Sequence, residues 1–392
     1  MRVLISGAGI VGPTLAYWLN HYGFETTIVE KAPRLRTGGY VIDFWGAGFD
    51  VAERMNLMEE IKSKGYLVEE VRIVDRTGRR VAGFPAAAFA RATGGRYVSL
   101  PRADLAALIF GRIADRVEPI FDDSISTIRE ESNCARVVFA SGLQREFDLV
   151  VGADGLHSRV REIAFGPEAQ FEQFLGYKAA AFEVAGYRPR DELVYVMYTE
   201  VGQQVGRFAM RDDRTMILLT FADRDPDVGG PSAQRALLRR RFGSSGWECP
   251  AILDALDSAD GPEDLYFDRV SQIRMKAWSR GRVVLVGDAA YCVSLLAGQG
   301  SALGMAGAYI LAGELHRAKG NYSLAFARYG ALFGPLIDAK QKASLRFAGT
   351  FAPKSRTAMW LRNRIFNLLS IGWVADLAVG RDLADRILLP DY

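Results

Sequence analysis

The sequence predicts an α/β fold, in which a Rossmann-like nucleotide-binding domain carries an inserted antiparallel β-sheet domain and C-terminal helices. Three observations lead to this fold class. A strand–helix–strand unit of about 30 residues opens the chain. Short segments of alternating polarity fill residues 171–275, and helical spacing dominates after residue 301. Because another buried strand comes late, at 283–286, we expect the first domain to be discontinuous.

The opening unit follows from the spacing of apolar residues. Residues 2–6 form a short apolar run that ends at a glycine, residues 10–22 show helical spacing, and residues 26–29 form a β-branched run before Glu30. Further elements expected in this domain are a helix over 45–64, a hairpin of strands 71–74 and 80–84, a helix over 102–114, and strands between 117 and 151.

The insertion and the tail have different patterns. We expect strands at 178–184, 193–198, 207–210, 215–221 and 265–275, helices at 232–242 and 250–258, and then helices at 301–319, 322–347 and 357–385. This divides the chain into a discontinuous first domain (1–170 and 277–340), a β-rich substrate domain (171–276) and a C-terminal helical segment (341–392). Aromatic residues alternate along the insertion, so that one face of its sheet can pack into the core and the other can line a substrate cavity. The sequence does not say which of them points to which face. These residues are Phe174, Tyr177, Phe182, Tyr195, Tyr198, Phe208 and Phe221.

Composition excludes several classes of protein. The chain has 392 residues and is 49% hydrophobic. Its net charge of +3 is too small to indicate a nucleic-acid-binding protein. Three widely spaced cysteines form no disulfide framework and fit a reducing compartment, so we expect a cytoplasmic protein. Three scattered histidines, without HExxH or CxxC spacing, predict no metal site. Residues 289–313 carry no formal charge, but their glycines favour a buried loop and helix over a membrane span.

Three glycines follow the first strand directly and open the first helix. Gly7 is placed to make the tight turn, Gly9 to let the backbone approach a pyrophosphate, and Gly12 to permit close packing of helix on strand. The helix N-terminus adds unpaired N–H groups and a positive partial charge. Glu30, at the end of the second strand, is placed to accept hydrogen bonds from ribose hydroxyls. Together they predict a dinucleotide site.

A later constellation separates FAD from NAD. A buried strand ends at Gly287-Asp288, and Gly298-Gln299-Gly300 then opens a helix. A carboxylate at a strand end can hold the hydroxyls of a ribityl chain, and the helix N-terminus beyond it can face the N1 and C2 carbonyl side of an isoalloxazine. Taken alone, Asp288 could equally be a helix cap. Taken with the first glycine loop, it favours a flavin.

With the segment Gly152–Arg161 (GADGLHSRVR), these motifs resemble those of class A FAD-dependent aromatic monooxygenases, the para-hydroxybenzoate hydroxylase family, over nearly the whole chain. Within that family the chain is most similar to the tetracycline-inactivating flavin monooxygenases, at 16–19, 287–292, 307–315 and 388–392. The resemblance implies that Asp154 and Gly155 lie by the nicotinamide and the flavin pyrophosphate. It also implies that Arg102 contacts FAD and that Arg36 lines the same site.

The resemblance further implies an enzyme that uses FAD, with NAD(P)H as co-substrate and O₂. It would hydroxylate a small aromatic or polycyclic molecule, such as a tetracycline-like polyketide, through a C4a-hydroperoxyflavin. No side chain is assigned as a catalytic acid or base. The expected partners are these small molecules, with no nucleic acid and no membrane span, and the protein is expected to be a monomer or a weak dimer. The chain departs from the family at Val293 and Leu295, where proline is usual, and at Ala302, where asparagine is frequent.

Two other functions stay open. One is a flavin oxidoreductase that inserts no oxygen, which the mass of the product would distinguish. The other is a degenerate FAD-binding protein that only binds a ligand, which Leu295 and Ala302 suggest. Substrate-stimulated consumption of NADPH would decide against that second alternative.

Overall fold

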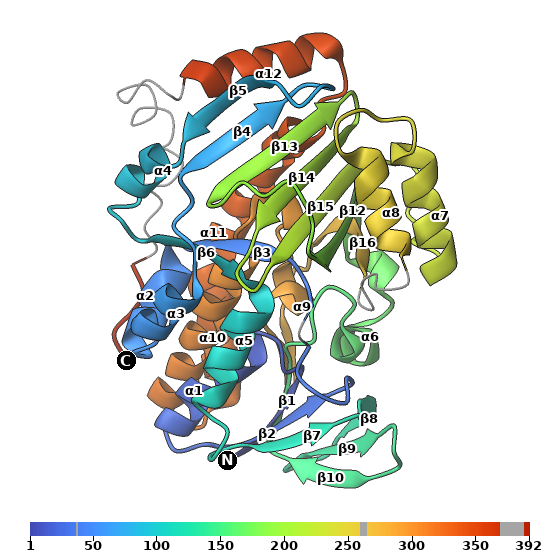
Figure 1. Ribbon diagram of the computed structural model, residues 1–392. Coiled ribbons are helices and arrows are strands. Elements are labelled where there is room, and N and C mark those ends of the chain that lie inside the picture. The colour runs from blue at the N-terminus through green and yellow to red at the C-terminus, as the bar shows by residue number, and fades with distance from the viewer. Residues whose placement is uncertain (37, 259–264, 369–387) are drawn as a thin grey trace.

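The computed structural model describes residues 1–36, 38–258, 265–368 and 388–392. The chain forms two halves (Figure 1), the lower one built around a mostly parallel sheet and the upper one around a larger, mostly antiparallel sheet. This is the α/β class that the sequence predicts.

The lower sheet contains the opening strand–helix–strand unit. Its strands lie in the order β17-β18-β11-β1-β2-β7, and neighbours are parallel except β17 and β18. The strands are β1 (Arg2–Ser6), β2 (Glu25–Glu30), β7 (Glu118–Phe121), β11 (Leu149–Gly152), β17 (Ser279–Arg280) and β18 (Val283–Leu285). In register, Ser6 pairs with Gly152 and Gly152 with Leu285. The carboxyl ends of the three central strands therefore lie side by side, although they come from distant parts of the chain.

Two helices of the lower half, α1 (Val11–His21) and α10 (Gly300–Arg317), pack against each other (Figure 1). Every residue of α10 from Leu303 to Leu315 is buried. The uncharged run at 289–313 thus passes through a short helix and a loop and ends in a core helix, as expected. Within the described residues no helix is both long and apolar enough to span a bilayer.

The prediction of a single helix over residues 45–64 is wrong. The chain first forms strand β3 (Val41–Trp45), paired antiparallel with β6 (Tyr97–Pro101), and then two helices, α2 (Ala47–Arg54) and α3 (Met58–Lys64). Buried Ile42 and Phe44 alternate with outward residues, which is the two-residue period of a strand. The helices are separated at Asn56, whose φ of 54° is left-handed and interrupts a right-handed helix.

The upper sheet has the strand order β16-β12-β15-β14-β13-β4-β5. Its strands are β4 (Glu70–Val74), β5 (Arg80–Pro85), β12 (Glu172–Ala185), β13 (Val194–Glu200), β14 (Gln203–Ala209), β15 (Arg214–Ala222) and β16 (Tyr266–Ile273). The expected hairpin β4–β5 joins this sheet through parallel pairing of β4 with β13, although the sequence places it within the range 1–170. The domain boundaries themselves stay a prediction.

The two faces of the upper sheet bury different aromatic residues. Phe182, Tyr198 and Phe221 pack beneath α7 (Pro231–Phe242) and α8 (Cys249–Asp257). Tyr195 and Phe208 instead belong to a cluster on the opposite face, with Tyr66 and Tyr40 of the lower half. Of these five aromatics, Tyr195 and Phe208 therefore face the lower half of the molecule.

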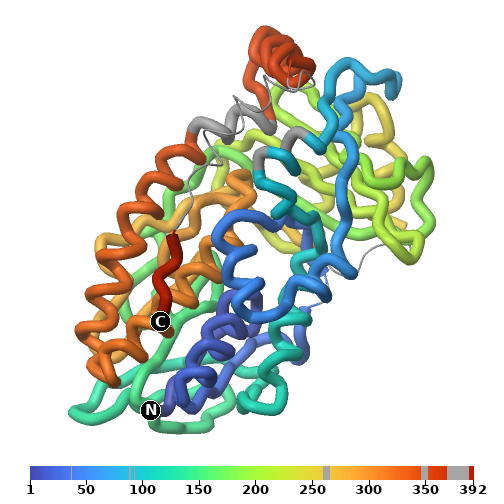
Figure 2. The backbone as a smooth tube through the Cα atoms, turned by 90° about the vertical axis from the view of Figure 1, so that its left-hand side faces the viewer, coloured from blue at the N-terminus to red at the C-terminus, as the bar shows by residue number. Residues whose placement is uncertain are grey.

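The C-terminal segment spans both halves. Helix α11 (Tyr322–Phe351) leads to α12 (Arg356–Leu368), which covers β5 (Figure 1). The rings of Phe84 on β5 and Phe366 on α12 lie 5.4 Å apart. The remainder of the helix expected over 357–385 lies outside the described residues. Residues 388–392 run beside the helices of the lower half (Figure 2), where the Tyr392 hydroxyl donates to Glu314 at 2.9 Å.

Short elements complete the chain: α4 (Ala87–Ala92), α5 (Arg102–Gly111), β8 (Ile125–Glu130), β9 (Ala135–Phe139), β10 (Gln144–Phe147), α6 (Arg159–Phe165), η1 (Glu168–Gln170), α9 (Asp288–Tyr291) and η2 (Leu295–Ala297).

Candidate active site

The first glycine loop joins β1 to α1, and its three glycines have different reasons to be glycine. Gly7 has a φ of +107°, and a Cβ there would lie 2.6 Å from the carbonyl oxygen of Ala153. A Cβ on Gly12 would overlap the carbonyl oxygen of Gly7. At Gly9, by contrast, the nearest atom to a Cβ would be Nη2 of Arg102 at 3.9 Å. Packing explains Gly7 and Gly12, whereas only a ligand would explain Gly9.

The N-terminus of α1 is open to an anion. Neither a capping side chain nor an acidic residue occupies its first turn. The first N–H groups of any helix lack intrahelical partners and lie at the positive end of the helix dipole. In α1 no side chain caps these groups, so they can bind a ligand. This is the environment that a pyrophosphate requires.

Glu30 supports the glycine loop directly. Its two carboxylate oxygens each accept one backbone hydrogen bond, Oε2 from the N–H of Ala8 at 2.9 Å and Oε1 from the N–H of Ala32 at 3.0 Å. The side chain is partly exposed, and a carboxylate has about four acceptor positions. Glu30 can therefore hold the loop and still accept from ribose hydroxyls.

The second motif lies against the first, since Ala153 contacts the turn at Gly7. Asp154 accepts hydrogen bonds from the Ser158 hydroxyl at 2.5 Å and the Val160 N–H at 3.1 Å, which secures the start of α6. Burial raises the pKa of Asp154. Gly155 has a φ of +82° and open space where a Cβ would stand. Asp154 thus shapes the loop, and Gly155 leaves its backbone accessible.

The third motif completes the same edge of the parallel sheet. A Cβ on Gly287, which has a φ of +68°, would lie 3.0 Å from Val11 at the start of α1. A Cβ on Gly300 would lie 3.5 Å from Oδ1 of Asp288, so this carboxylate lies at the N-terminus of α10. Gly298 is left-handed, with no atom within 4 Å of the position of a Cβ. The three motifs, separated by over 100 residues each, therefore meet.

Asp288 belongs to an electrostatic cluster with Arg102 and Tyr40. Burial raises the pKa of Asp288, while the charge of Arg102 and a hydrogen bond from Cys292 lower it. Burial also raises the pKa of Tyr40 to about 12 against the opposing effect of Arg102. The guanidinium of Arg102 makes no hydrogen bond or ion pair within the described ranges of the chain. A half-buried cation without such a partner fits a ligand that supplies acceptors.

Arg36 is not brought into this cluster. Its side chain is exposed and has no hydrogen bond or ion pair among the described residues. Its role in the site stays a prediction.

Arg161 ties the second motif to the upper sheet. Its fully buried guanidinium donates to the carbonyl of Ala289 at 3.0 Å and to the carboxylate of Glu168 at 2.7 Å. Glu168 also accepts from Arg269 of β16 at 2.7 Å. The motif that sequence analysis associates with the nicotinamide is therefore anchored to both halves of the molecule.

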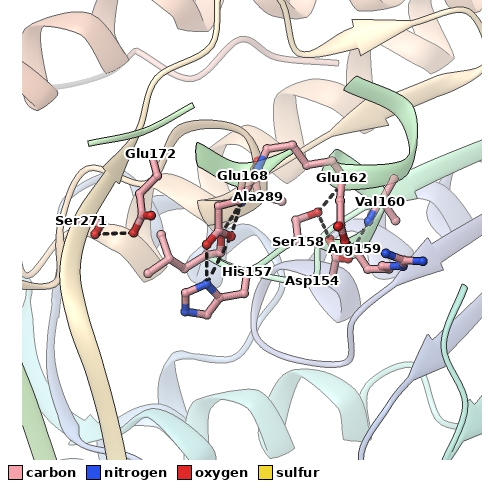
Figure 3. Close-up of polar contacts among 12 residues, drawn as sticks. Asp154, His157, Ser158, Arg159, Val160, Glu162, Glu168, Glu172, Ser271 and Ala289 are labelled. Carbon is pink, nitrogen blue, oxygen red and sulfur yellow. Dashed lines mark hydrogen bonds and ion pairs between the residues drawn. The ribbon is translucent and has the colours of Figure 1, made fainter. Parts of the chain in front are cut away.

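His157 makes a second link of this kind. Its Nδ1 lies 2.9 Å from a carboxylate oxygen of Glu168 and its Nε2 lies 3.1 Å from Asp268 of β16. Figure 3 draws the contact between His157 and Glu168 as a dashed line. These hydrogen bonds, that with Asp268 first and that with Glu168 second, raise the pKa of His157 to about 9. A protonated imidazole donates to both carboxylates, so it joins the lower half to the upper sheet near neutral pH.

One departure from the family pattern has a local explanation. Ala302 on α10 packs against Gly48 on α2, whose added Cβ would lie 2.8 Å from the Ala302 Cβ. The carbonyl of Val293 accepts from the buried side chains of Gln272 at 3.0 Å and Ser344 at 2.9 Å, but a proline carbonyl could accept the same bonds, so they do not explain the valine. Nothing in the structure explains the leucine at position 295 in the same way, although it is partly buried. A larger residue at position 302 would force α2 and α10 apart.

Fold and site together define a dinucleotide-binding flavoprotein. The residues fit FAD on two observations, the open backbone at Gly9 and Gly298 and the guanidinium of Arg102, which has no acceptor among the described residues. Residues 1–320 match the family model of an FAD binding domain, and the chain belongs to this family.

Individual relatives define the enzyme class. A flavin-dependent monooxygenase from an unknown prokaryotic organism is 35% identical over 405 residues, covering 100% of this chain and 99% of that one. A flavin-dependent monooxygenase of Legionella longbeachae is 31% identical over 396 residues, covering 100% and 98%. The crystal structure of the tetracycline destructase Tet(51) superposes with a TM-score of 0.85 at 30% identity, covering 100% and 99%. The protein is an FAD-dependent monooxygenase, and the predicted resemblance to class A flavoprotein hydroxylases is confirmed.

Sequence reasoning missed several residues around this cluster, among them Tyr40, Asp43, Tyr266 and Asp268. They come from β3, β16 and the loop before β3, and none belongs to a motif of regular spacing. Only Arg161 and His157 carried a signal, because both lie within the second motif.

Proposed function

We propose that this protein uses NAD(P)H and O₂ to hydroxylate a small aromatic or polycyclic substrate. One observation supports it above all others. Three loops from distant parts of the chain meet at one edge of the parallel sheet, and the aromatic face of the upper sheet lies toward that half. Sites at a junction of two such units are where cofactors and substrates commonly meet.

We assign the cofactor to the residues of the three motifs. Gly7, Gly9 and Gly12, with the N-terminus of α1, would hold the pyrophosphate, and Glu30 the adenosine ribose. Asp288 would hold the ribityl hydroxyls, while Gly298, Gly300 and the N-terminus of α10 would face the pyrimidine side of the ring. Arg102 would supply donors beside it, with Asp154 and Gly155 bordering the pyrophosphate.

Bound FAD supplies the redox chemistry and the activation of oxygen. The chain supplies binding, orientation and exclusion of water. Tyr40 and Tyr266, whose rings lie 5.4 Å apart, come from the two halves and meet at this junction. Burial raises the pKa of both phenols, so both stay protonated and act as hydrogen-bond donors at neutral pH.

Two observations support the proposed substrate class, the aromatic cluster between the two halves and the names of proteins similar to this one. Tyr195 and Tyr40 are partly buried rings of the cluster between the halves, in which Phe208 and Tyr66 are buried. A planar polycyclic molecule matches such surfaces through stacking. Because proteins similar to this one are named tetracycline destructases, a tetracycline is the first candidate substrate.

The test is turnover by the FAD-loaded protein under labelled O₂. Tetracycline should stimulate the oxidation of NADPH or NADH, and mass spectrometry should find one labelled oxygen atom in the product. A product that gains no oxygen would identify a flavin oxidoreductase instead. Tight binding with no stimulation of NAD(P)H oxidation, across a panel of phenolic polyketides, would identify a ligand-binding protein.

A further inference from the structure

The carboxylate of Asp43 stands where the two halves of the molecule meet. Its Oδ1 accepts three hydroxyl hydrogen bonds, from Ser99 at 2.6 Å, Tyr97 at 2.8 Å and Tyr195 at 3.2 Å. Ser99 and Tyr97 lie on β6 of the lower half, whereas Tyr195 lies on β13 of the upper sheet. Three donors from two elements fix the direction of this side chain.

The other oxygen of Asp43 has no partner among the residues that the structure describes. Within the described ranges, Oδ2 accepts no hydrogen bond, and no lysine, arginine or histidine pairs with the carboxylate. The side chain of Asp43 is exposed, so a ligand can reach it. A carboxylate that is covered by a ligand without a compensating cation costs free energy. The unpaired oxygen therefore favours a ligand with a positive charge.

The surroundings of Asp43 are aromatic. The rings of Tyr195 and Phe208 lie 4.6 Å apart, and the ring of Tyr66 lies 5.2 Å from that of Phe208. Burial first, and then the charge of Asp43, raises the pKa of Tyr195 well above its usual value. Tyr195 is therefore a neutral phenol at neutral pH, and its hydroxyl donates a hydrogen bond to Oδ1 of Asp43. An anion beside aromatic faces suits a cation carried on an aromatic framework.

Asp43 also lies close to the cofactor cluster. It is three residues after Tyr40, which interacts with Arg102 and Asp288, and at the strand rise of about 3.3 Å per residue this is roughly 10 Å. Strand β6, which carries Ser99, leads directly into Arg102. One polycyclic molecule can therefore reach both the flavin site and Asp43.

We propose that Asp43 is the specificity-determining residue that binds a protonated amine of the substrate, with Oδ2 as the acceptor. The inference rests on the proposed function and adds the chemical class, an aromatic or polycyclic compound that bears an ammonium group. A neutral hydroxyl at this position would satisfy the hydrogen bond but leave the charge uncompensated. Ser99, Tyr97 and Tyr195 are positioning residues that aim the carboxylate.

The experiment compares matched ligands on matched variants. FAD-loaded protein is titrated with tetracycline and its dedimethylamino derivative, and with naphthylmethylamine and naphthylmethanol, while the flavin absorbance is followed. The variants are Asp43→Asn and, as a control for net charge, Glu192→Gln, an exposed carboxylate just before β13. Asp43→Ser gives a second neutral variant if the Asn variant does not fold, because its hydroxyl can join the same network.

The unsubstituted protein should prefer the amine of each pair. Asp43→Asn should lower the affinity for the amines roughly ten- to a hundred-fold and leave the neutral partners within about twofold. Glu192→Gln should leave all four affinities unchanged. Equal losses for amine and neutral ligand, no loss at all, or no binding of either amine to the unsubstituted protein would overturn the inference. Selective loss of amine binding without oxygen insertion would refute only the proposed function.

Discussion

The carbonyl oxygen of Gly7 occupies the space that a Cβ on Gly12 would need. This contact holds α1 against the end of β1 and has nothing to do with a ligand. Gly9, between them, has free space around it, with only Arg102 at 3.9 Å. A fingerprint that reads as one motif therefore combines two requirements, close packing and approach of a ligand.

The two requirements can be separated by substitution. Gly9→Val should fold with the Tm of the parent apoprotein but lose FAD, because its side chain enters space that the pyrophosphate would occupy. Gly12→Ala should instead destabilise the apoprotein, by about 1–3 kcal/mol as overpacked positions do. Thermal unfolding and titration with FAD, followed by fluorescence, measure both. Full retention of FAD by Gly9→Val would show that the pyrophosphate lies elsewhere.

Glu30→Ala should weaken FAD and ADP-ribose together. The carboxylate holds the N–H groups of Ala8 and Ala32 and is assigned to the ribose, so its loss should cost about 1.5–3 kcal/mol in binding. Calorimetric titration with both ligands measures the loss. Glu25→Ala is the control, since Glu25 begins the same strand and its exposed side chain has no partner among the described residues. Unchanged affinity of Glu30→Ala for ADP-ribose would contradict the ribose assignment.

Asp288→Ala should distinguish the two halves of the cofactor. Its carboxylate lies at the N-terminus of α10 near Arg102, far along the chain from the adenosine side, so affinity for FAD should fall by roughly 1.5–3 kcal/mol. Affinity for ADP-ribose should stay that of the parent. If both ligands lose equally, Asp288 acts through folding and not through the ribityl chain.

The link made by His157 should depend on pH. Its pKa in the folded protein, about 9, lies above the ordinary value of 6.5. The stabilisation is therefore fully present below pH 6.5 and is lost as pH rises through 9. The side chain is 46% exposed, so solvent screens the pair and the effect on Tm should be modest.

His157→Gln is the variant that checks this. The difference in Tm between the parent and His157→Gln should be largest near pH 6 and should shrink toward pH 10. His21→Gln should show no such trend, because the imidazole of His21, in the last turn of α1, packs against Trp18 and pairs with no carboxylate among the described residues. A constant difference across the range would mean that His157 stabilises by packing alone.

The sequence by itself determined the parts of this protein that depend on local spacing. The strand–turn–helix of residues 2–21, the buried strand before Asp288 and the core helix α10 all follow from the order of apolar residues and glycines. The same glycines predict the cofactor site, because a tight turn, close packing of the helix on the strand and a close ligand together require them at that spacing. Local patterns were less reliable at residues 41–64, where a strand and two helices replace one expected helix.

Only the tertiary structure decided which distant residues meet. Parallel pairing of β1, β11 and β18 brings Gly7, Ala153 and Asp288 to one edge, and the pairing of β4 with β13 adds a hairpin to the upper sheet. The oriented carboxylate of Asp43 depends on hydroxyls 54, 56 and 152 residues away. No spacing in the sequence marks such a contact, because its energy comes from burial and hydrogen bonding between elements that become neighbours only on folding.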